Sequence, residues 1–213
     1  MNDKIGYEYL DADFYDKLTE SPNPVRRFFH NKRYEILRYM VRKHYRPGMR
    51  ILDVGGATST WNKDKIPVIG LDINKRFLEY ALKKGRITGY IFGDVFKEEL
   101  GKNHIIIASE FLEHIETYPV LLGILKYSLK KNGVLIVTVP YDTGLSLWRY
   151  LFGLQCFLYG RIMGLPYYRN NGGHVNHFSP YFLKWVLERA GFRVLEEYNF
   201  MRLTITIIAE LRE

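Results

Sequence analysis

The chain has 213 residues, of which 47% are hydrophobic, and it carries a formal net charge of +8. This length and hydrophobic content fit one domain with a large core, and the single cysteine excludes both an internal disulfide and a site held by several thiolates. Because no uncharged apolar run reaches the roughly 18 residues of a membrane-spanning helix and the acidic, aromatic N-terminus is unlike a secretory signal, we expect a cytoplasmic protein.

Short apolar strands alternate with helices along most of the chain. Apolar residues at helical spacing predict a first helix over 24–45, which Pro47 and Gly48 end. The other expected elements are strands over 50–55, 68–71, 89–94, 104–110 and 134–140, helices over 75–84, 118–133 and 179–191, and two closing strands over 192–200 and 202–211. This alternation predicts an α/β fold with a doubly wound, mostly parallel sheet and helices on both faces. The last connection, 199–202, is too short for a parallel crossover, so the last strand should run antiparallel.

A glycine turn follows the first strand in "RILDVGGATST". In doubly wound sheets, ligands bind beyond the carboxyl ends of the strands. Gly55 and Gly56 allow the backbone to approach a ligand closely, because a Cβ would block it. Ala57 and Ser59 are small enough to be tolerated there, with some widening of the loop.

Acidic residues stand at the ends of the first three strands. Asp72 comes 19 residues after Asp53 and is placed to accept hydrogen bonds from ribose hydroxyls. Asp94 can meet an adenine amino group, with the N–H of Val95 facing a ring nitrogen. The three acids together predict a site for a cofactor that contains a nucleoside.

The residues around the turn distinguish between cofactors. A dinucleotide fold needs a further glycine to seat a diphosphate on a helix N-terminus, and Thr60 and Trp61 occupy that stretch instead. The carboxylate of Asp53 would repel a diphosphate, whereas it would favour a cationic amino acid group, directly or through water. The turn therefore favours a cationic cofactor over a dinucleotide such as NAD.

The motifs "ILDVGGATS", "VIGLDIN", "FGDVF", "SEFLEHI" and "LKKNGVLIVTVP" resemble those of the class I S-adenosylmethionine-dependent methyltransferases, in the small-molecule branch called type 11 or 12. The resemblance extends from about residue 48 to the C-terminus, except 141–178. The family has glycines where this chain has Ala57 and Ser59. The resemblance implies a seven-stranded sheet and S-adenosyl-L-methionine as the cofactor.

The resemblance also implies roles for residues and segments. Gly55–Ala57 would line the methionine end, and Glu110 would lie near the cofactor and the transfer point. The full predicted cofactor-binding set is Asp53, Val54, Gly55, Gly56, Ala57, Ser59, Asp72, Ile73, Asp94, Val95 and Glu110. We expect one domain over 1–213, with a helical lid at 1–47 and a variable, substrate-capping insertion at 141–178.

Three residues are candidates for chemistry or substrate contact. Methyl transfer depends on positioning, and a base is needed only when the acceptor must lose a proton. His114, His174 and Tyr141 are the candidates, although His114 has a structural alternative as a histidine bonded within its loop. His174 and His177 stand three residues apart with no carboxylate nearby in the sequence, which is a poor metal site, so no metal is predicted.

The insertion has several possible partners. Its many apolar residues, together with Arg149, Arg161 and Arg169, suit a lid over a bulky acceptor. They also suit peripheral membrane contact through 145–165, a homodimer surface, or an ordinary buried helix pair.

We therefore predict methyl transfer to a small or lipophilic acceptor, with a catalytically degenerate binding module as the alternative. The +8 charge fits nucleic acid, but "SEFLEHI" stands where some base-modifying relatives carry an Asn/Asp-Pro-Pro-Tyr motif, so a nucleic-acid substrate is disfavoured.

Overall fold

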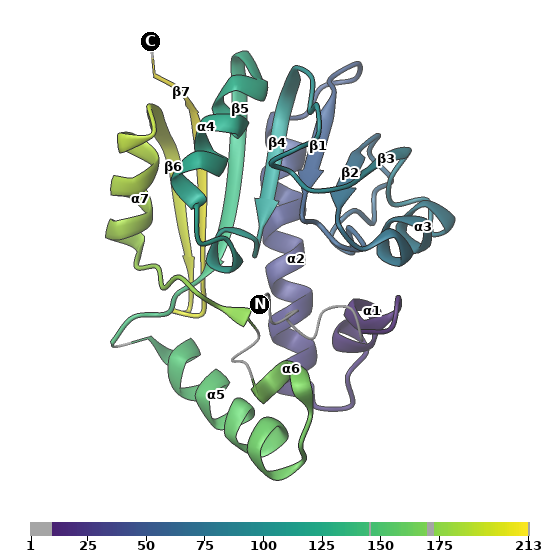
Figure 1. The fold of residues 1–213 in the computed structure, drawn as a ribbon, viewed down its shortest axis with the longest axis vertical. Helices are drawn as coiled ribbons and strands as arrows, with labels where there is room; N and C mark the ends of the chain where they lie inside the picture. Colours follow the sequence, from purple (N-terminus) through teal and green to yellow (C-terminus); the bar gives the residue numbers. More distant parts are fainter. Residues whose placement is uncertain (1–9, 145, 170–172, 213) are drawn as a thin grey trace.

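The computed structural model describes residues 10–144, 146–169 and 173–212. Within them, seven strands form one sheet in the order β3-β2-β1-β4-β5-β7-β6 (Figure 1). The strands are β1 (Ile51–Val54), β2 (Ile69–Asp72), β3 (Gly89–Phe92), β4 (Asn103–Ser109), β5 (Leu129–Pro140), β6 (Phe192–Phe200) and β7 (Thr204–Leu211). β1 to β5 pair in parallel, and β7 is antiparallel to both β5 and β6. The predicted fold class, including the antiparallel last strand, is confirmed.

Helices cover both faces of the sheet, as the alternation predicted. On one face, Leu37 and Val41 of α2 pack with Ile107 of β4 and Ile136 of β5. On the other, α4 and α7 enclose a second core with β4, β5 and β7. The helices are α1 (Phe14–Thr19), α2 (Pro24–His44), α3 (Lys75–Lys83), the 3₁₀ turn η2 (Leu112–His114), α4 (Tyr118–Ser128), α5 (Leu147–Gln155), the π-helical η3 (Cys156–Ile162), α6 (Pro166–Arg169) and α7 (Pro180–Arg189).

The end of α4 differs from the predicted helix over 118–133. The helix ends at Ser128, and β5 begins at Leu129, which is buried and pairs with Asn103 of β4. The chain then passes through a left-handed residue, Asn132 (φ 63°), before the regular part of β5. Burial of the Leu129 side chain in the core therefore decides the conformation of a stretch whose basic residues and glycine indicated a helix end.

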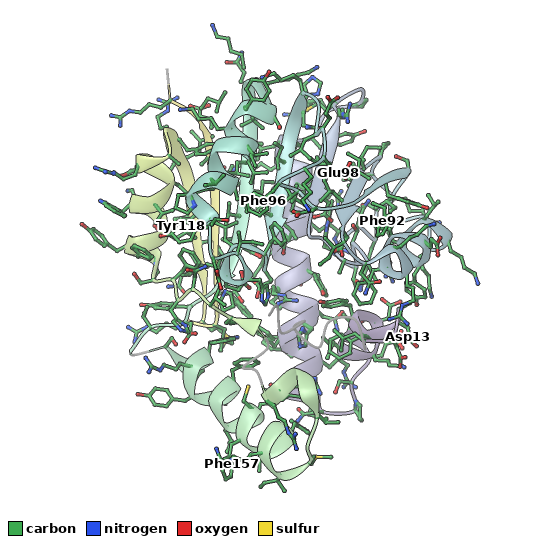
Figure 2. All side chains as sticks on the ribbon, viewed as in Figure 1. Asp13, Phe92, Phe96, Glu98, Tyr118 and Phe157 are labelled. Atoms are coloured by element: carbon green, nitrogen blue, oxygen red, sulfur yellow. The ribbon has the colours of Figure 1, made fainter. Side chains whose placement is uncertain are left out.

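A cap formed by α5, η3 and α6 lies beyond the carboxyl ends of the parallel strands (Figure 1). Phe157, labelled in Figure 2, lies on the outer side of this cap. The amino-terminal half of α2 reaches the cap, where Arg26 Nη2 donates a hydrogen bond to Tyr168 Oη at 2.7 Å. The carboxyl-terminal half of α2 packs in the core, so this helix joins the cap to the sheet.

Parts of the predicted lid and insertion lie outside the described residues, namely 1–9, 145 and 170–172. The division of the chain into a domain, a lid and an insertion stays a prediction. Across the described ranges, no helix is both long enough and apolar enough to span a bilayer.

Candidate functional site

The carboxyl ends of β1, β2 and β4 bring the glycine turn, Asp72 and Glu110 to one edge of the sheet. Two hydrogen bonds fasten the turn to β2. The Gly55 N–H donates to the carbonyl of Leu71 at 2.8 Å, and the Ala57 N–H donates to Asp72 Oδ2 at 3.1 Å. The structure therefore joins the glycine motif and the predicted ribose-binding acid in one unit.

Every second residue of the turn, from Gly55 to Ser59, has a left-handed backbone. Gly55 has φ 61°, Ala57 has φ 47° and Ser59 has φ 43°. Only glycine adopts this region without strain, so the two positions where the resembling family has glycine are strained here. A Cβ on Gly55 would overlap the ring of Phe111, and one on Gly56 would overlap the carboxylate of Asp53. Both glycines are thus required by internal packing.

Asp53 lies beneath this turn with no exposed surface. Its Oδ2 accepts hydrogen bonds from Ser59 Oγ at 2.7 Å and from Trp61 Nε1 at 2.9 Å. Burial raises the pKa of Asp53, and the two hydrogen bonds oppose that rise. Its Oδ1 is buried and has no hydrogen-bond partner among the described residues. Asp53 therefore stabilises the turn through Oδ2, and its Oδ1 is available to accept a hydrogen bond.

The other two strand-end acids also organise their own loops. Asp72 is buried, and its Oδ1 accepts from the N–H of Asn74 at 2.8 Å. Asp94 Oδ1 accepts from the N–H of Phe96 at 3.0 Å. Val95 is buried, whereas Ile73 is exposed. The contacts of these residues with ribose and adenine stay predictions.

Glu110, which follows β4, is held from two sides. Arg33 Nη1 of α2 donates to Glu110 Oε2 at 3.0 Å, and Thr138 Oγ1 of β5 donates to Oε1 at 3.0 Å. The carboxylate of Glu110 and the phenol oxygen of Tyr34 hold the pKa of Arg33 above its ordinary value despite burial. Glu110 itself has a left-handed backbone, with φ 51°. The helix and the sheet thus fix this carboxylate at the predicted transfer edge.

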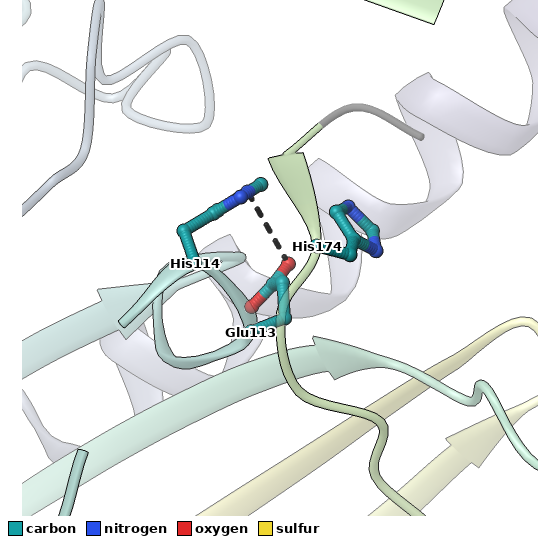
Figure 3. A group of neighbouring side chains, drawn as sticks. All are labelled: Glu113, His114 and His174. Carbon is teal, nitrogen blue, oxygen red and sulfur yellow. Dashed lines mark ion pairs between the residues drawn. The ribbon is translucent and has the colours of Figure 1, made fainter. Parts of the chain in front are cut away.

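Two of the three candidate catalytic residues lie together with a buried carboxylate (Figure 3). The His114 and His174 rings are 4.8 Å apart, and Glu113 Oε1 lies 3.9 Å from His114 Nε2. His174 stacks on Trp148 and Phe152 of α5, with ring centroids 5.2 and 5.4 Å away. Burial lowers the pKa of His114, and burial together with the neighbouring histidines lowers that of His174 to about 3.

A cavity of about 550 Å³ opens beside this group, between the end of β5 and α5. Its wall includes Trp148, Phe152 and His174, with Asp142 and His177 at one side. The Asp142 Oδ2 and His177 Nδ1 atoms are 2.5 Å apart, so His177 pairs with Asp142 and not with His174.

Tyr141, the third candidate, is placed differently. It forms a backbone bridge with Phe178, and its side chain packs against the core formed by α4 and α7.

The sequence reasoning passed over Arg33, Glu113 and Trp148 as site residues. Arg33 lies on a helix that is predicted from the spacing of its apolar residues. That spacing does not indicate which polar residues of the helix reach the site. Glu113 is far from His174 in the chain, so the sequence gives no sign that the two residues meet. The position of Trp148 depends on how the variable segment folds back over the sheet edge.

The strand order, the antiparallel β7 and the glycine turn at the end of β1 together define a Rossmann-like methyltransferase fold. Residues 28–197 match the model of a methyltransferase domain family, and the chain belongs to that family. No curated protein matches the sequence.

Solved structures share the fold at low sequence identity. One is a "possible exported protein" of Bordetella parapertussis, with TM-score 0.72 and 18% identity over 97% of this chain and 81% of that chain. Another is the magnesium protoporphyrin IX methyltransferase of Synechocystis with bound SAH, with TM-score 0.68 and 14% identity over 98% and 97%. A third is the N-methyltransferase NodS of Bradyrhizobium japonicum in complex with SAH, with TM-score 0.65 and 13% identity over 98% and 97%.

Proposed function

We propose that this methyltransferase uses S-adenosyl-L-methionine to methylate a small or lipophilic acceptor. The observation that carries the proposal is the meeting of the glycine turn, Asp72 and Glu110 at one sheet edge. Family membership and the SAH-bound neighbours with the same fold support the choice of cofactor.

The residues at the edge fit that cofactor in charge and shape. The buried Oδ1 of Asp53 has no hydrogen-bond partner among the described residues, and its charge would suit a cationic amino group. Asp72 would accept from ribose hydroxyls, Asp94 with Val95 would bind adenine, and Glu110 would lie near the methionine end. When bound, S-adenosylmethionine supplies an electrophilic methyl group: its S–CH₃ bond breaks as the acceptor bond forms, leaving S-adenosylhomocysteine. The chain's contribution is to orient both reactants and exclude water.

The cavity beside α5 is our candidate for the acceptor. Its aromatic wall, Trp148 and Phe152, suits a flat or lipophilic molecule, while the Asp142–His177 pair provides polar contacts. The catalytic roles of His114, His174 and Tyr141 stay predictions. His174 lines this cavity and contacts the ring of His114, which supports substrate contact by His174, whereas the packing of Tyr141 in the core favours a structural role.

Calorimetric titration with S-adenosylhomocysteine tests the cofactor assignment. We expect binding that Asp72→Asn weakens by about 1–3 kcal/mol, since one buried polar contact is left unmade. Asp64→Asn is the matched control, because Asp64 pairs with Arg38 and Arg42 away from the turn. Absence of binding up to millimolar ligand would refute the proposal.

The second candidate is a degenerate methyltransferase fold that binds ligands without turnover. The observation in its favour is the strained Ala57 and Ser59 at the usual glycine positions. Cofactor binding with no methylated product across a broad acceptor panel would favour this candidate, and any methylated product would exclude it.

The outer side of the cap supports an additional partner. Large apolar side chains are exposed on the cap and its connecting turn: Leu147, Tyr150, Leu151, Leu154, Phe157, Leu158, Ile162, Met163 and Leu165. We infer peripheral contact with an anionic membrane, with Arg149 and Arg161 meeting the headgroups. A homodimer is the competing outcome. A cytoplasmic location and the exclusion of nucleic acid stay predictions.

A further inference from the structure

Glu113, His114 and His174 come from two distant segments and converge at one point (Figure 3). Each residue offers a nitrogen or oxygen ligand atom, and these three atoms all lie within 4.8 Å of one another. Ligands of a tetrahedral zinc ion lie about 3.3 Å apart, given bonds of about 2.0–2.1 Å. Small side-chain movements would therefore bring the three atoms to bonding distance around one ion.

The carboxylate of Glu113 lacks the contacts that a buried charge needs. Its side chain is 1% exposed, and neither oxygen hydrogen-bonds to any described residue. The one nearby guanidinium, Arg33, is hydrogen-bonded to Glu110 and Tyr34 instead. Burying an unpaired carboxylate is costly unless a cation or hydrogen bonds compensate for it. Among the described residues, Glu110 and Glu113 share the single guanidinium of Arg33, so a bound cation would compensate the charge of Glu113.

The two histidines are oriented as ligands. His114 Nδ1 lies 3.1 Å from the carbonyl oxygen of Gly173, which can only accept, so Nδ1 carries the proton. The lone pair of Nε2 is then left on the side of Glu113. A backbone carbonyl that fixes the second nitrogen is the usual support of a metal-bound histidine. His174 meets the His114 ring edge-on and stacks on the rings of Trp148 and Phe152, and its buried Nδ1 has no hydrogen-bond partner in the described part of the chain.

We propose that Glu113, His114 and His174 form a site for a divalent transition metal of the zinc class. Two imidazoles and one carboxylate match zinc, whereas magnesium and calcium prefer oxygen ligands alone. Three protein ligands leave a coordination position open. Because His174 also lines the cavity, a metal held there would lie close to the space assigned to the acceptor.

The use of this metal in catalysis rests on the proposed function. An acceptor oxygen bound to the metal would lose its proton more readily, because the metal stabilises the negative oxygen. The oxygen would then form a bond to the methyl group as the S–CH₃ bond breaks, and the proton would pass to solvent. The site thus favours an acceptor with a hydroxyl group that can reach the metal.

Metal titration of the tag-free, chelator-treated protein tests the site. We expect one equivalent of Zn²⁺ by calorimetry and, with Co²⁺, a visible absorption band typical of low coordination number. Loss of a residue that supports a metal ligand weakens metal binding about 10–100-fold. His174→Ala and Glu113→Gln each remove a ligand itself, so each should weaken Zn²⁺ binding by at least that factor. His177→Ala is the matched control: it lies in the same segment and is bonded to Asp142 outside the cluster, so binding should be unchanged.

Folding of each variant is checked by circular dichroism and its unfolding midpoint. If Glu113→Gln does not fold, His174→Ala decides the question, since no hydrogen bond of this side chain to a described residue is lost. The proposal is overturned by a wild-type protein without stoichiometric Zn²⁺ binding, by unchanged affinity in His174→Ala, or by equal loss in His177→Ala. Titration with S-adenosylhomocysteine is measured on the same samples. Cofactor binding without metal binding refutes the metal site alone, whereas metal binding without cofactor binding refutes the proposed function alone.

Discussion

At the scale of single residues, the glycine turn holds a strained alanine whose relief can be measured. Ala57 is buried with a left-handed backbone (φ 47°), which costs an L-residue roughly 1–2 kcal/mol. Glycine removes that strain but adds about 0.4–1 kcal/mol of unfolded-state entropy. We therefore expect Ala57→Gly to raise the free energy of unfolding by about 0.5–1 kcal/mol in urea titrations.

The neighbouring position gives a control of opposite sign. Gly55→Ala places a Cβ against the ring of Phe111 in a left-handed backbone, so the same titration should show a loss of at least about 1 kcal/mol. A variant Ala57→Gly that is no more stable than wild type would show that the turn relaxes the strain in another way.

Asp53 predicts a pH dependence of stability. Its pKa is raised in the folded state because burial disfavours the charged carboxylate. Between the unfolded pKa, about 3.9, and the raised folded pKa, the native state holds more protons than the unfolded state. The slope of unfolding free energy against pH is then negative, so stability from this group falls as pH rises through that window.

Asp53→Asn removes this titration while keeping an acceptor for Ser59 and Trp61. We expect the variant's unfolding free energy to fall less between about pH 4 and neutrality than that of wild type. Denaturant titrations of both proteins at several pH values, without cofactor, measure their unfolding free energies. In the difference between wild type and variant, the contributions of all other titrating groups cancel. Parallel profiles for the two proteins would contradict the assignment.

At the scale of elements, the sequence was sufficient wherever local signals agreed with burial. The helix expected over 179–191 is α7, and Ser179 caps its start, because Ser179 Oγ accepts from the N–H of Phe182. The short link after Asn199 predicted the antiparallel pair. The α4 boundary was misplaced because the burial of Leu129 is a tertiary effect that local composition does not carry.

The residues of the candidate site likewise fall into those that the sequence predicts and those that depend on tertiary packing. Asp72 was predictable because successive strand ends meet at one edge, so spacing along the chain translates into position. The approach of His174 to Glu113 was not, since it depends on the path of 141–178 and on stacking against Trp148. Likewise, the pairing of Arg33 with Glu110 depends on how α2 lies across the sheet.

The cap makes a prediction as an element. Phe157 is 55% exposed among other apolar side chains on its outer side, and burying a phenylalanine contributes about 1.5–3 kcal/mol. We therefore expect Phe157→Asp to reduce co-sedimentation with anionic vesicles about tenfold or more. Added salt should weaken wild-type binding, because Arg149 and Arg161 contribute electrostatically.

Tyr181→Asp, at an 81% exposed aromatic residue on α7, is the matched control and should bind vesicles as wild type does. Wild type that stays in the supernatant would contradict membrane contact. If Phe157→Asp instead abolishes a concentration-dependent dimer in sedimentation velocity, the outer side of the cap is a subunit interface.

At the scale of the whole molecule, the predicted cofactor edge and the cap lie at the same end of the sheet, where the parallel strands end. Helices cover the hydrophobic cores on the two faces of the sheet. The turn is fastened to β2, and α2 connects Glu110 to the cap through Arg33 and Arg26. A ligand that contacts the turn in the folded state alone must therefore stabilise the whole cooperative unit.

S-adenosylhomocysteine at 100 times its dissociation constant should add about 2.7 kcal/mol to the free energy of unfolding. For a chain of this length, that corresponds to a rise of the unfolding midpoint by roughly 5–10 °C. Calorimetric scans with and without ligand measure the shift, and Asp72→Asn should need a higher ligand concentration to reach it. The shift should persist in chelator-treated protein, because the turn shares no residue with the Glu113, His114 and His174 cluster. An unchanged midpoint at millimolar ligand would mean that the folded chain does not bind S-adenosylhomocysteine, even though it has the methyltransferase fold.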